Sequence, residues 1–215
     1  MIRVICILIG YACGLFQTSY IIGRVNGIDI RDFGSGNAGT TNTMRTLGRK
    51  AGLITFLGDV FKCVFAVSLV RIVFEAGYGG NMPLLVMYTT AGVVLGHNFP
   101  FYLNFRGGKG IAATAGLLIS LHPVTGILGA AVFLTVLFTT HFVSLGSLLV
   151  YTGLVIEVIV LGQTGAFGME QSYLNEMYIV VFLLAVLAFW KHRENIGRLR
   201  AGCERKTYLT KKSDM

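Results

Sequence analysis

Long apolar segments, separated by short polar connections, constrain the fold of this chain more than any other feature of its sequence. Hydrophobic residues make up 54% of the 215 residues and charged residues only 13%, whereas about 25% of a soluble domain is charged. A helix needs about 20 apolar residues to cross a bilayer. The candidate segments for such helices are 2–23, 52–74, 83–98, 110–122, 124–140, 143–162 and 176–190. The sequence therefore predicts an all-α, polytopic integral membrane helix bundle that forms one domain over residues 1–215.

The number of membrane crossings is less sharply defined than the helical class. Segments 110–122 and 124–140 are short for a span, so they form either one bent hairpin around His122-Pro123 or two tilted helices in a thinned bilayer. We expect seven transmembrane helices, with five as the alternative. No small-residue cleavage site follows the first segment, which is therefore expected to stay as the first helix.

Basic residues predict the orientation of the bundle. Of the 18 lysines and arginines, 15 lie in three places: 24–50, 98–109 and the tail from Lys191 onward. The connections 75–82 and 163–175 contain none. Because cytoplasmic loops carry the excess of Lys and Arg, the three basic segments are predicted to be cytoplasmic and the N-terminus to lie outside. Lys211 and Lys212 are interpreted as contacts with anionic lipid.

The first of these polar segments is rich in glycine, hydroxyl and amide groups. Gly34 and Gly36 flank Ser35, so successive N–H groups can face an anion. Arg45 follows ten residues after Ser35 and can add a bidentate contact to a phosphate. The alternative is a glycine turn with a serine cap and a lipid-facing arginine.

Two further polar segments have the same character. Lys109 follows two glycines at the start of an apolar helix, where free N–H groups and a partial positive charge favour an anion. The G-x-x-x-x-G-K-[ST] pattern of a nucleotide-binding loop is missing. After the last apolar segment, His192 and Asn195 fall on one helical face, with Arg198 near it. The alternatives are a tight anchoring turn and a basic, lipid-binding tail.

Other polar residues lie inside the apolar segments. Asp59 and Lys62, three residues apart, form either a functional site or a structural ion pair. Ser144 and Ser147 either face the site or pack helices together. The cysteines show no paired spacing and the histidines no metal-ligand spacing, so neither disulfides nor a metal site is predicted. The net charge of +8 favours cytoplasmic anchoring and an anionic substrate over nucleic acid.

The three polar segments read GSGNAGTTNTMR over 34–45, GHNFPFYLNFRGGKG over 96–110 and HRENIGRLRAGCE over 192–204. They resemble the signature motifs of the bacterial acyl-phosphate:glycerol-3-phosphate acyltransferase family, PlsY, and Asp59 and Lys62 match a further D-x-x-K pattern. Order and spacing agree over nearly the whole chain. Two positions depart from the first motif: Ala38 stands where the family usually has proline, which loosens the loop, and Thr40 where it usually has alanine.

The resemblance implies an activity and a location. In this family a fatty acyl-phosphate donates its chain to the 1-hydroxyl of glycerol 3-phosphate, giving lysophosphatidic acid and phosphate in the first step of phospholipid biosynthesis. Family members use neither acyl-CoA nor acyl carrier protein, and no cofactor is expected. They have seven spans, with the motifs on the cytoplasmic side of the bacterial inner membrane. A soluble enzyme that forms acyl-phosphate is the partner expected at the basic face.

The resemblance also implies a role for each motif residue. The residues expected in catalysis are Ser35, Arg45, His192 and Asn195. Those expected to bind substrate are Gly36, Asn37, Thr41, Asn42, Asp59, Lys62, Gly107, Gly108, Lys109, Gly110 and Arg198, together with Ser144 and Ser147, which lie outside the motifs and are expected from their place in the sixth apolar segment. Within these sets, Ser35 and the amides of Gly36 and Asn37 would hold the acyl-phosphate, and the glycines near Lys109 would let the backbone approach glycerol 3-phosphate. Glu204 is expected to be structural, paired with a basic residue.

Such a reaction needs no enzyme nucleophile, because acyl-phosphate is a mixed anhydride with a good leaving group. Neither a Ser-His-Asp order nor a nucleophile elbow is present in the sequence. The acceptor hydroxyl needs a base, which is either the phosphate of glycerol 3-phosphate, whose second pKa is about 6, or His192. The alternatives of other classes are a membrane scaffold and a transporter of phosphorylated metabolites, although transporters place their sites between repeats at the midplane.

Overall fold

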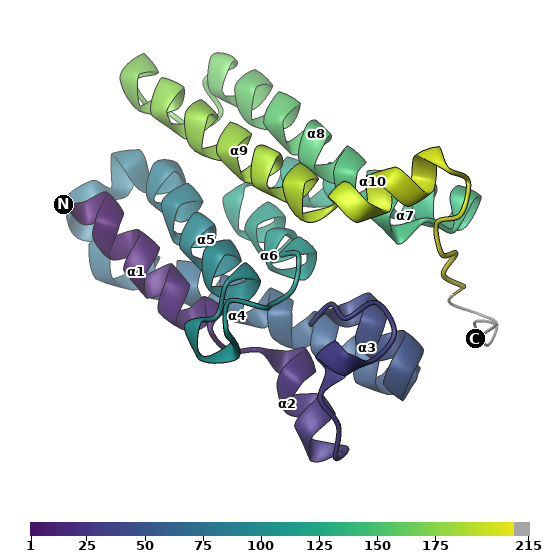
Figure 1. The fold of residues 1–215 in the computed structure, drawn as a ribbon. Helices are drawn as coiled ribbons and strands as arrows, with labels where there is room; N and C mark the ends of the chain where they lie inside the picture. Colours follow the sequence, from purple (N-terminus) through teal and green to yellow (C-terminus); the bar gives the residue numbers. More distant parts are fainter. Residues whose placement is uncertain (209–215) are drawn as a thin grey trace.

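The computed structural model describes residues 1–208, among which every regular element is a helix (Figure 1). The longer helices are α1 (Ile2–Gly14), α4 (Arg49–Tyr78), α5 (Met82–Asn98), α6 (Ile111–Leu121), α7 (Pro123–Thr140), α8 (Val143–Gln163) and α9 (Gln171–Lys191). The shorter ones are α2 (Thr18–Val25), α3 (Thr40–Leu47) and α10 (Arg193–Arg200). The predicted all-α class is confirmed. Lys211 and Lys212, predicted to contact lipid, lie outside the described residues.

Five helical stretches of the described chain are long and apolar enough to cross a membrane. They are Ile2–Val25, Arg49–Leu103, Pro123–Thr140, Val143–Gln163 and Gln171–Lys191. The second stretch, 55 residues long, contains α4 and α5, which the turn Gly79–Asn81 joins and which pack side by side. The 11 residues of α6 extend only about 17 Å, well short of the ~30 Å of a bilayer core. Seven crossings therefore stay a prediction.

The first predicted segment, 2–23, is not one continuous helix but is interrupted between α1 and α2. The side chain of Gln17 is fully buried at this point, and its Nε2 donates to the carbonyl oxygen of His97 at 3.0 Å. The carbonyl oxygen of Phe16 accepts from Lys62 Nζ at 2.8 Å. Buried polar groups need partners, and the interruption frees backbone and side-chain groups for these contacts between helices.

Glycines bring α1 and α5 into close contact. Gly10 and Gly14 on α1, and Gly92 and Gly96 on α5, all lie at this interface, where an added Cβ would clash with the backbone of the other helix. On Gly92 it would lie 2.2 Å from the carbonyl oxygen of Ile7. Pairs of small residues spaced by four are typical of membrane helix interfaces, because they let backbones approach.

Replacing Gly92 by alanine is expected to destabilise the protein by about 1–3 kcal/mol, because an overpacked interface must move apart. Thermal unfolding in detergent would show a lower Tm. The matched control is Gly77→Ala on α4, where an added Cβ meets nothing within 4 Å and alanine favours the helix. An unchanged Tm for Gly92→Ala would show that α1 and α5 do not depend on this close approach.

The remaining helices close a ring, in which α5 packs on α6, α6 on α7, α7 on α8, α8 on α9, and α9 on α5 again. α4 covers α5 and α6. An ion pair between Arg3 of α1 and Glu176 of α9 joins two sides of the bundle near the N-terminus, and Tyr88 of α5 donates to the same carboxylate at 2.6 Å. α6 and α7 fold back on each other, and Gly129 packs against Leu118.

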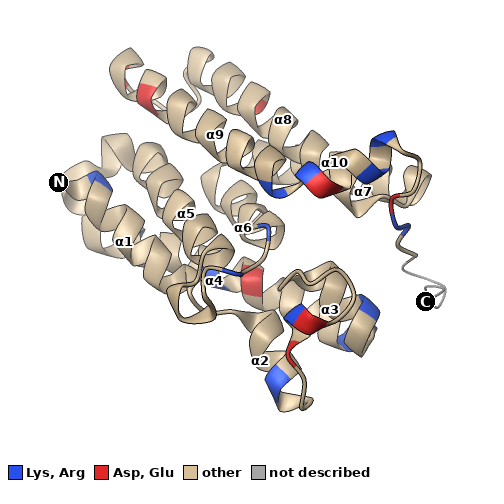
Figure 2. Ribbon diagram, in the orientation of Figure 1, with Lys and Arg blue, Asp and Glu red and all other residues tan. Residues whose placement is uncertain are grey.

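Most charged residues lie at the end of the bundle that carries α2, α3 and α10 (Figure 2). We call this part of the molecule the charged end; it contains the basic segments 24–50, 98–109 and 191–208. The opposite end holds the Arg3–Glu176 pair. Segments that are far apart in the sequence are thus brought to one end of the bundle, as their charge pattern predicted, while the orientation of that end in a membrane stays a prediction.

Candidate active site

Polar side chains from five parts of the chain lie together at the charged end. They are Arg45 of α3, Lys109 before α6, Ser144 of α8, Asn195 and Arg198 of α10, and Glu204 of the tail. Each of these residues was predicted from the sequence as a site residue, but the contacts between them were not predicted. We call this group the polar cluster.

Glu204 is at the centre of the polar cluster. Its carboxylate accepts from Ser144 Oγ at 2.8 Å and from Asn195 Nδ2 at 2.6 Å, and it forms an ion pair with Arg198 at 2.7 Å. Burial alone would raise the pKa of Glu204, but these three hydrogen bonds outweigh burial and lower it below its usual value. A charged Glu204 therefore ties α8, α10 and the tail together, and it pairs with a basic residue as expected.

Lys109 faces α10 from the opposite side. Its Nζ donates to Asn195 Oδ1, so the Asn195 amide joins Lys109 to Glu204. Burial, together with the positive charge of the nearby Arg198, lowers the pKa of Lys109 to about 8. A cation that is partly stripped of water, with a lowered pKa, is typical of a functional site. Such a group gains from binding an anion.

His192 lies between α9 and α10 and is buried. Its Nδ1 lies 2.8 Å from the carbonyl oxygen of Ala188, which only accepts, so Nδ1 carries the proton and Nε2 has a free lone pair. Burial, together with the charge of Lys109, lowers the pKa of His192 to about 4. The imidazole is therefore neutral at physiological pH.

Arg45 reaches the tail. Its guanidinium donates to Thr207 Oγ1 at 2.6 Å and to the carbonyl oxygen of Arg205 at 3.1 Å. The backbone N–H of Thr207 in turn donates to the carbonyl oxygen of His141, between α7 and α8, at 2.8 Å. The tail is thus held against α3 on one side and the α7–α8 turn on the other. No sequence pattern pointed to Thr207, which lies outside the three motifs.

Asn42 shapes the loop that precedes α3. Its Oδ1 accepts from the backbone N–H of Ser35 at 2.8 Å and from the Ser35 hydroxyl at 3.2 Å, and its Nδ2 donates to the carbonyl oxygens of Ile30 and Phe33 at 3.0 Å each. Gly34 has a φ of 61°, and an added Cβ there would lie 2.3 Å from Asn42 Oδ1. Asn42 was predicted to bind substrate; in this structure its amide is used in holding Ser35.

One more predicted residue of this loop, Gly36, has a local role. The N–H of Gly36, predicted to face acyl-phosphate, closes a turn by donating to the carbonyl oxygen of Phe33 at 3.0 Å. Asn37 and Thr41 are half-buried. The hydroxyl of Thr40, one of the two departures from the family pattern, is buried without a hydrogen-bond partner among the described residues. Ser35 itself is exposed.

The glycines before Lys109 let the loop pack against the end of α5. Gly107 N–H donates to the carbonyl oxygen of Asn98 at 3.3 Å, and Gly108 N–H to that of His97 at 3.1 Å. An added Cβ on Gly108 would lie 2.1 Å from Nε2 of His97. The backbone of these glycines does make a close approach, as predicted, but in this structure it approaches the end of α5. Gly110, which follows Lys109, has a φ of 80° and caps the N-terminus of α6.

Three further predicted substrate-binding residues, from the helices themselves, also lie outside the polar cluster. Asp59 and Lys62 form an ion pair at 2.8 Å, with side chains 1% and 4% exposed. Ser147 donates to the carbonyl oxygen of Val143 at 2.8 Å, within its own helix. His97, which contacts Lys62, was not among the predicted site residues, although its place inside the second motif was a signal for it.

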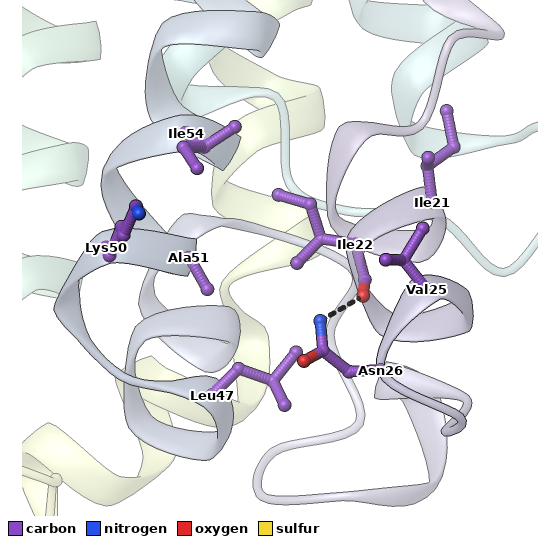
Figure 3. A pocket seen from close by; sticks show the side chains of 8 residues that line it. All are labelled: Ile21, Ile22, Val25, Asn26, Leu47, Lys50, Ala51 and Ile54. Atoms are coloured by element: carbon purple, nitrogen blue, oxygen red, sulfur yellow. Dashed lines mark hydrogen bonds between the residues drawn. The ribbon is translucent and has the colours of Figure 1, made fainter.

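A groove of about 350 Å³ lies between α2 and the start of α4 (Figure 3). Its lining is mainly apolar: Ile21, Ile22, Val25, Asn26, Leu47, Lys50, Ala51 and Ile54. The Asn26 amide donates to the carbonyl oxygen of Ile22 at 2.8 Å, so it is already used within α2. None of the predicted site residues lines this groove. In residues 1–208 no group of three or more His, Cys, Asp or Glu side chains is placed to hold a metal ion.

The sequence matches the family model described as glycerol-3-phosphate acyltransferase over residues 4–202. Glycerol-3-phosphate acyltransferases of Clostridioides difficile (strain 630) and Alkaliphilus metalliredigens (strain QYMF) are 42% and 39% identical to it, over 94% and 96% of both chains. Crystal structures of PlsY (YgiH), an integral membrane glycerol 3-phosphate acyltransferase, share 27% identity. The glycerol 3-phosphate form has a TM-score of 0.82 and covers 96% of each chain. The lysophosphatidic acid form has a TM-score of 0.79 and covers 96% of this chain and 95% of its own. The chain therefore belongs to the glycerol-3-phosphate acyltransferase family of membrane enzymes.

Proposed function

We propose that this protein transfers a fatty acyl group from acyl-phosphate to the 1-hydroxyl of glycerol 3-phosphate, giving lysophosphatidic acid and phosphate. The observation that carries the proposal is the gathering of Arg45, Lys109 and Arg198 in one partly buried cluster. Both substrates carry a phosphate, and cations that are shielded from water bind such groups strongly. A solved relative in a glycerol 3-phosphate form supports the choice of acceptor.

In the proposed reaction, the acceptor oxygen attacks the acyl carbonyl carbon. The bond between that carbon and the phosphate oxygen breaks, and its electron pair leaves with inorganic phosphate. Lys109 and Arg198 would hold phosphate groups, and the exposed hydroxyl of Ser35 would stabilise charge that develops on the carbonyl oxygen. The phosphate is a good leaving group, so direct transfer needs no acyl-enzyme intermediate.

The proton of the acceptor hydroxyl would pass to the phosphate of glycerol 3-phosphate itself. That dianion has a pKa of about 6, whereas the pKa of His192 is about 4, so the substrate phosphate is the stronger base. His192→Gln is therefore expected to raise KM and to keep substantial turnover at saturation. Steady-state kinetics with both substrates varied would measure this. A near-zero kcat at saturation would instead make His192 the base.

The charge of Lys109 predicts a pH dependence. Because the pKa of Lys109 is about 8, its positive charge is present below pH 8 and is lost as the pH rises through that value. The kcat/KM for glycerol 3-phosphate, which reports the free enzyme, is expected to fall above pH 8 by up to about tenfold per unit. Lys109→Arg keeps the charge at high pH and should move this fall upward. Identical profiles for the two proteins would exclude Lys109 as the titrating group.

The proposal includes a location. Seven helices would cross the bacterial inner membrane, with the N-terminus outside and the charged end in the cytoplasm. Arg193, Arg200, Arg205 and Lys206 are exposed at that end, and they form a basic surface suited to a soluble enzyme that supplies acyl-phosphate. Glycerol 3-phosphate is an anion that does not cross the bilayer unaided, so vesicles should consume it only when it is added on the cytoplasmic side.

The test of the reaction supplies palmitoyl-phosphate to the purified protein in detergent, with and without glycerol 3-phosphate. Release of phosphate that depends on the acceptor, and that Ser35→Ala removes without changing the Tm, would support the proposal. Transfer from palmitoyl-CoA but not from palmitoyl-phosphate would overturn the donor. If no donor gives transfer, the reaction itself is overturned, and uptake of glycerol 3-phosphate into proteoliposomes becomes the next measurement.

A further inference from the structure

A buried polar group lies directly beneath the loop that carries Lys109. It consists of Asp59 and Lys62 of α4 and His97 of α5, whose side chains are all at most 4% exposed. An ion pair inside a membrane bundle costs free energy, because both charges must leave water. Apolar residues of similar size would often be as stable there. Stability alone therefore does not account for this buried polar group.

The ammonium group of Lys62 uses all of its hydrogen-bond donors. Its Nζ lies 2.8 Å from each of three acceptors: Asp59 Oδ1, the carbonyl oxygen of Phe16 and Nδ1 of His97. An ammonium has three N–H donors and no acceptor, so Nδ1 of His97 accepts. The proton of the neutral imidazole then lies on Nε2. Lys62 thus fixes both the position and the tautomer of the His97 ring.

The other side of the His97 ring touches Gly108 of the loop that carries Lys109, and Gly108 also lies against Ala38 of the first glycine-rich loop. Nε2 lies against Gly108, where an added Cβ would be 2.1 Å away, and the same Cβ would be 2.6 Å from the carbonyl oxygen of Ala38. The backbone of His97 contributes as well, because its carbonyl oxygen accepts from Gly108 N–H at 3.1 Å and from Gln17 Nε2 at 3.0 Å. Lys109 is the next residue after Gly108.

We infer that Asp59, Lys62 and His97 form a positioning device for the loop Gly107–Lys109. They do not touch substrate. They hold the end of α5 and the His97 ring in place. Gly108 then packs against Ala38, and Lys109 donates to Asn195. The inference rests on the proposed function, in which Lys109 binds the phosphate of glycerol 3-phosphate. It gives a reason for keeping three ionisable side chains in the buried interior of the bundle.

The test uses Asp59→Asn combined with Lys62→Met in the full chain, because removing both charges leaves no buried charge unpaired. A misplaced Lys109 is expected to raise the KM for glycerol 3-phosphate about tenfold, since small displacements in a site cost large factors. The KM for palmitoyl-phosphate and the kcat at saturation should change by less than about threefold. A general loosening of the fold would raise both KM values alike, and that result would overturn the inference.

A second variant keeps the network and removes only its contact with the loop. In His97→Asn the amide oxygen stands near the position of Nδ1 and still accepts from Lys62, but the part of the ring that touches Gly108 is gone. The same selective rise in the KM for glycerol 3-phosphate is expected. An unchanged KM in either folded variant would overturn the inference.

The matched control is Glu176→Gln, which breaks the Arg3–Glu176 pair at the opposite end of the bundle. It is expected to lower the Tm and to leave both KM values unchanged. A change in the KM for glycerol 3-phosphate equal to that of the test variants would show that the effect is not specific to the loop, and would overturn the inference.

Binding of glycerol 3-phosphate, measured by calorimetry, separates this inference from the proposed function. If the wild type does not turn over palmitoyl-phosphate, the proposed donor fails, but binding still decides the inference. A Kd weakened about tenfold in the test variants and not in Glu176→Gln would support it. An unchanged Kd in the variants, or no binding by the wild type, would overturn it.

Discussion

Replacing Glu204 by alanine is expected to lower kcat/KM about 1,000-fold, or about 4 kcal/mol. The Glu204 carboxylate holds Ser144, Asn195 and Arg198 at once, at 2.8, 2.6 and 2.7 Å. Without this carboxylate, Arg198 loses its ion-pair partner and Asn195 loses the acceptor of its amide N–H. Asn195 is then free to move, and Lys109, which donates to Asn195, loses its fixed position. Steady-state kinetics with both substrates would measure the loss.

The control for Glu204 is Glu194→Ala on the neighbouring helix α10. Glu194 has the same charge, but its side chain is exposed. We expect its replacement to change kcat/KM by less than about threefold, because exposed charges contribute little. Glu204→Gln tests the charge separately, because glutamine keeps the size of the side chain and one acceptor oxygen. Its kcat/KM should lie between that of Glu204→Ala and that of the wild type. If Glu204→Ala kept the activity of the wild type, the tail would have no part in the site.

Replacing Asn42 by alanine is expected to lower kcat/KM about 100-fold, or about 3 kcal/mol. The amide of this buried residue makes four hydrogen bonds that fold the loop around Ser35. Alanine leaves the carbonyl oxygens of Ile30 and Phe33 without these donors, so the loop relaxes and the Ser35 hydroxyl loses its position. Kinetics would give the loss, and hydrogen exchange at the Ser35 amide should become faster.

Asn26→Ala is the matched control for Asn42. Asn26 is exposed and makes one side-chain hydrogen bond, to the carbonyl oxygen of Ile22, so its loss should leave kcat/KM within about threefold of the wild type. An Asn42→Ala protein with normal kinetics and slow exchange at Ser35 would show that the glycines alone shape the loop.

Much of the helical framework could be predicted because it depends on contiguous residues. Apolar runs at 83–98, 124–140 and 143–162 correspond to α5, α7 and α8 within one residue at each end, since hydropathy is a property of neighbouring side chains. The same reasoning missed α3. Its residues are polar, and α3 is held by packing on α4, where Gly52 leaves room for the side chain of Met44.

The candidate site could be predicted by residue type but not by partner. Glycine, amide and cationic residues identified the three motifs, because phosphate chemistry needs those groups. Nothing local showed that Asn42, predicted to bind substrate, would hold Ser35, or that the amides of Gly107 and Gly108 would pair with the end of α5. Those outcomes depend on which backbone groups lie opposite them once the helices have packed.

The sequence by itself determined the helical membrane class and the gathering of basic segments at one end, and it predicted which residues bind phosphate. Only the tertiary structure decided that the first helix stops before Gln17, that Lys62 finds the carbonyl oxygen of Phe16, 46 residues away, and that Ser144 finds Glu204, 60 residues away. The physical reason is that hydropathy and charge act through short windows of sequence. A buried hydrogen bond forms with whichever group the packing of the whole bundle brings within reach.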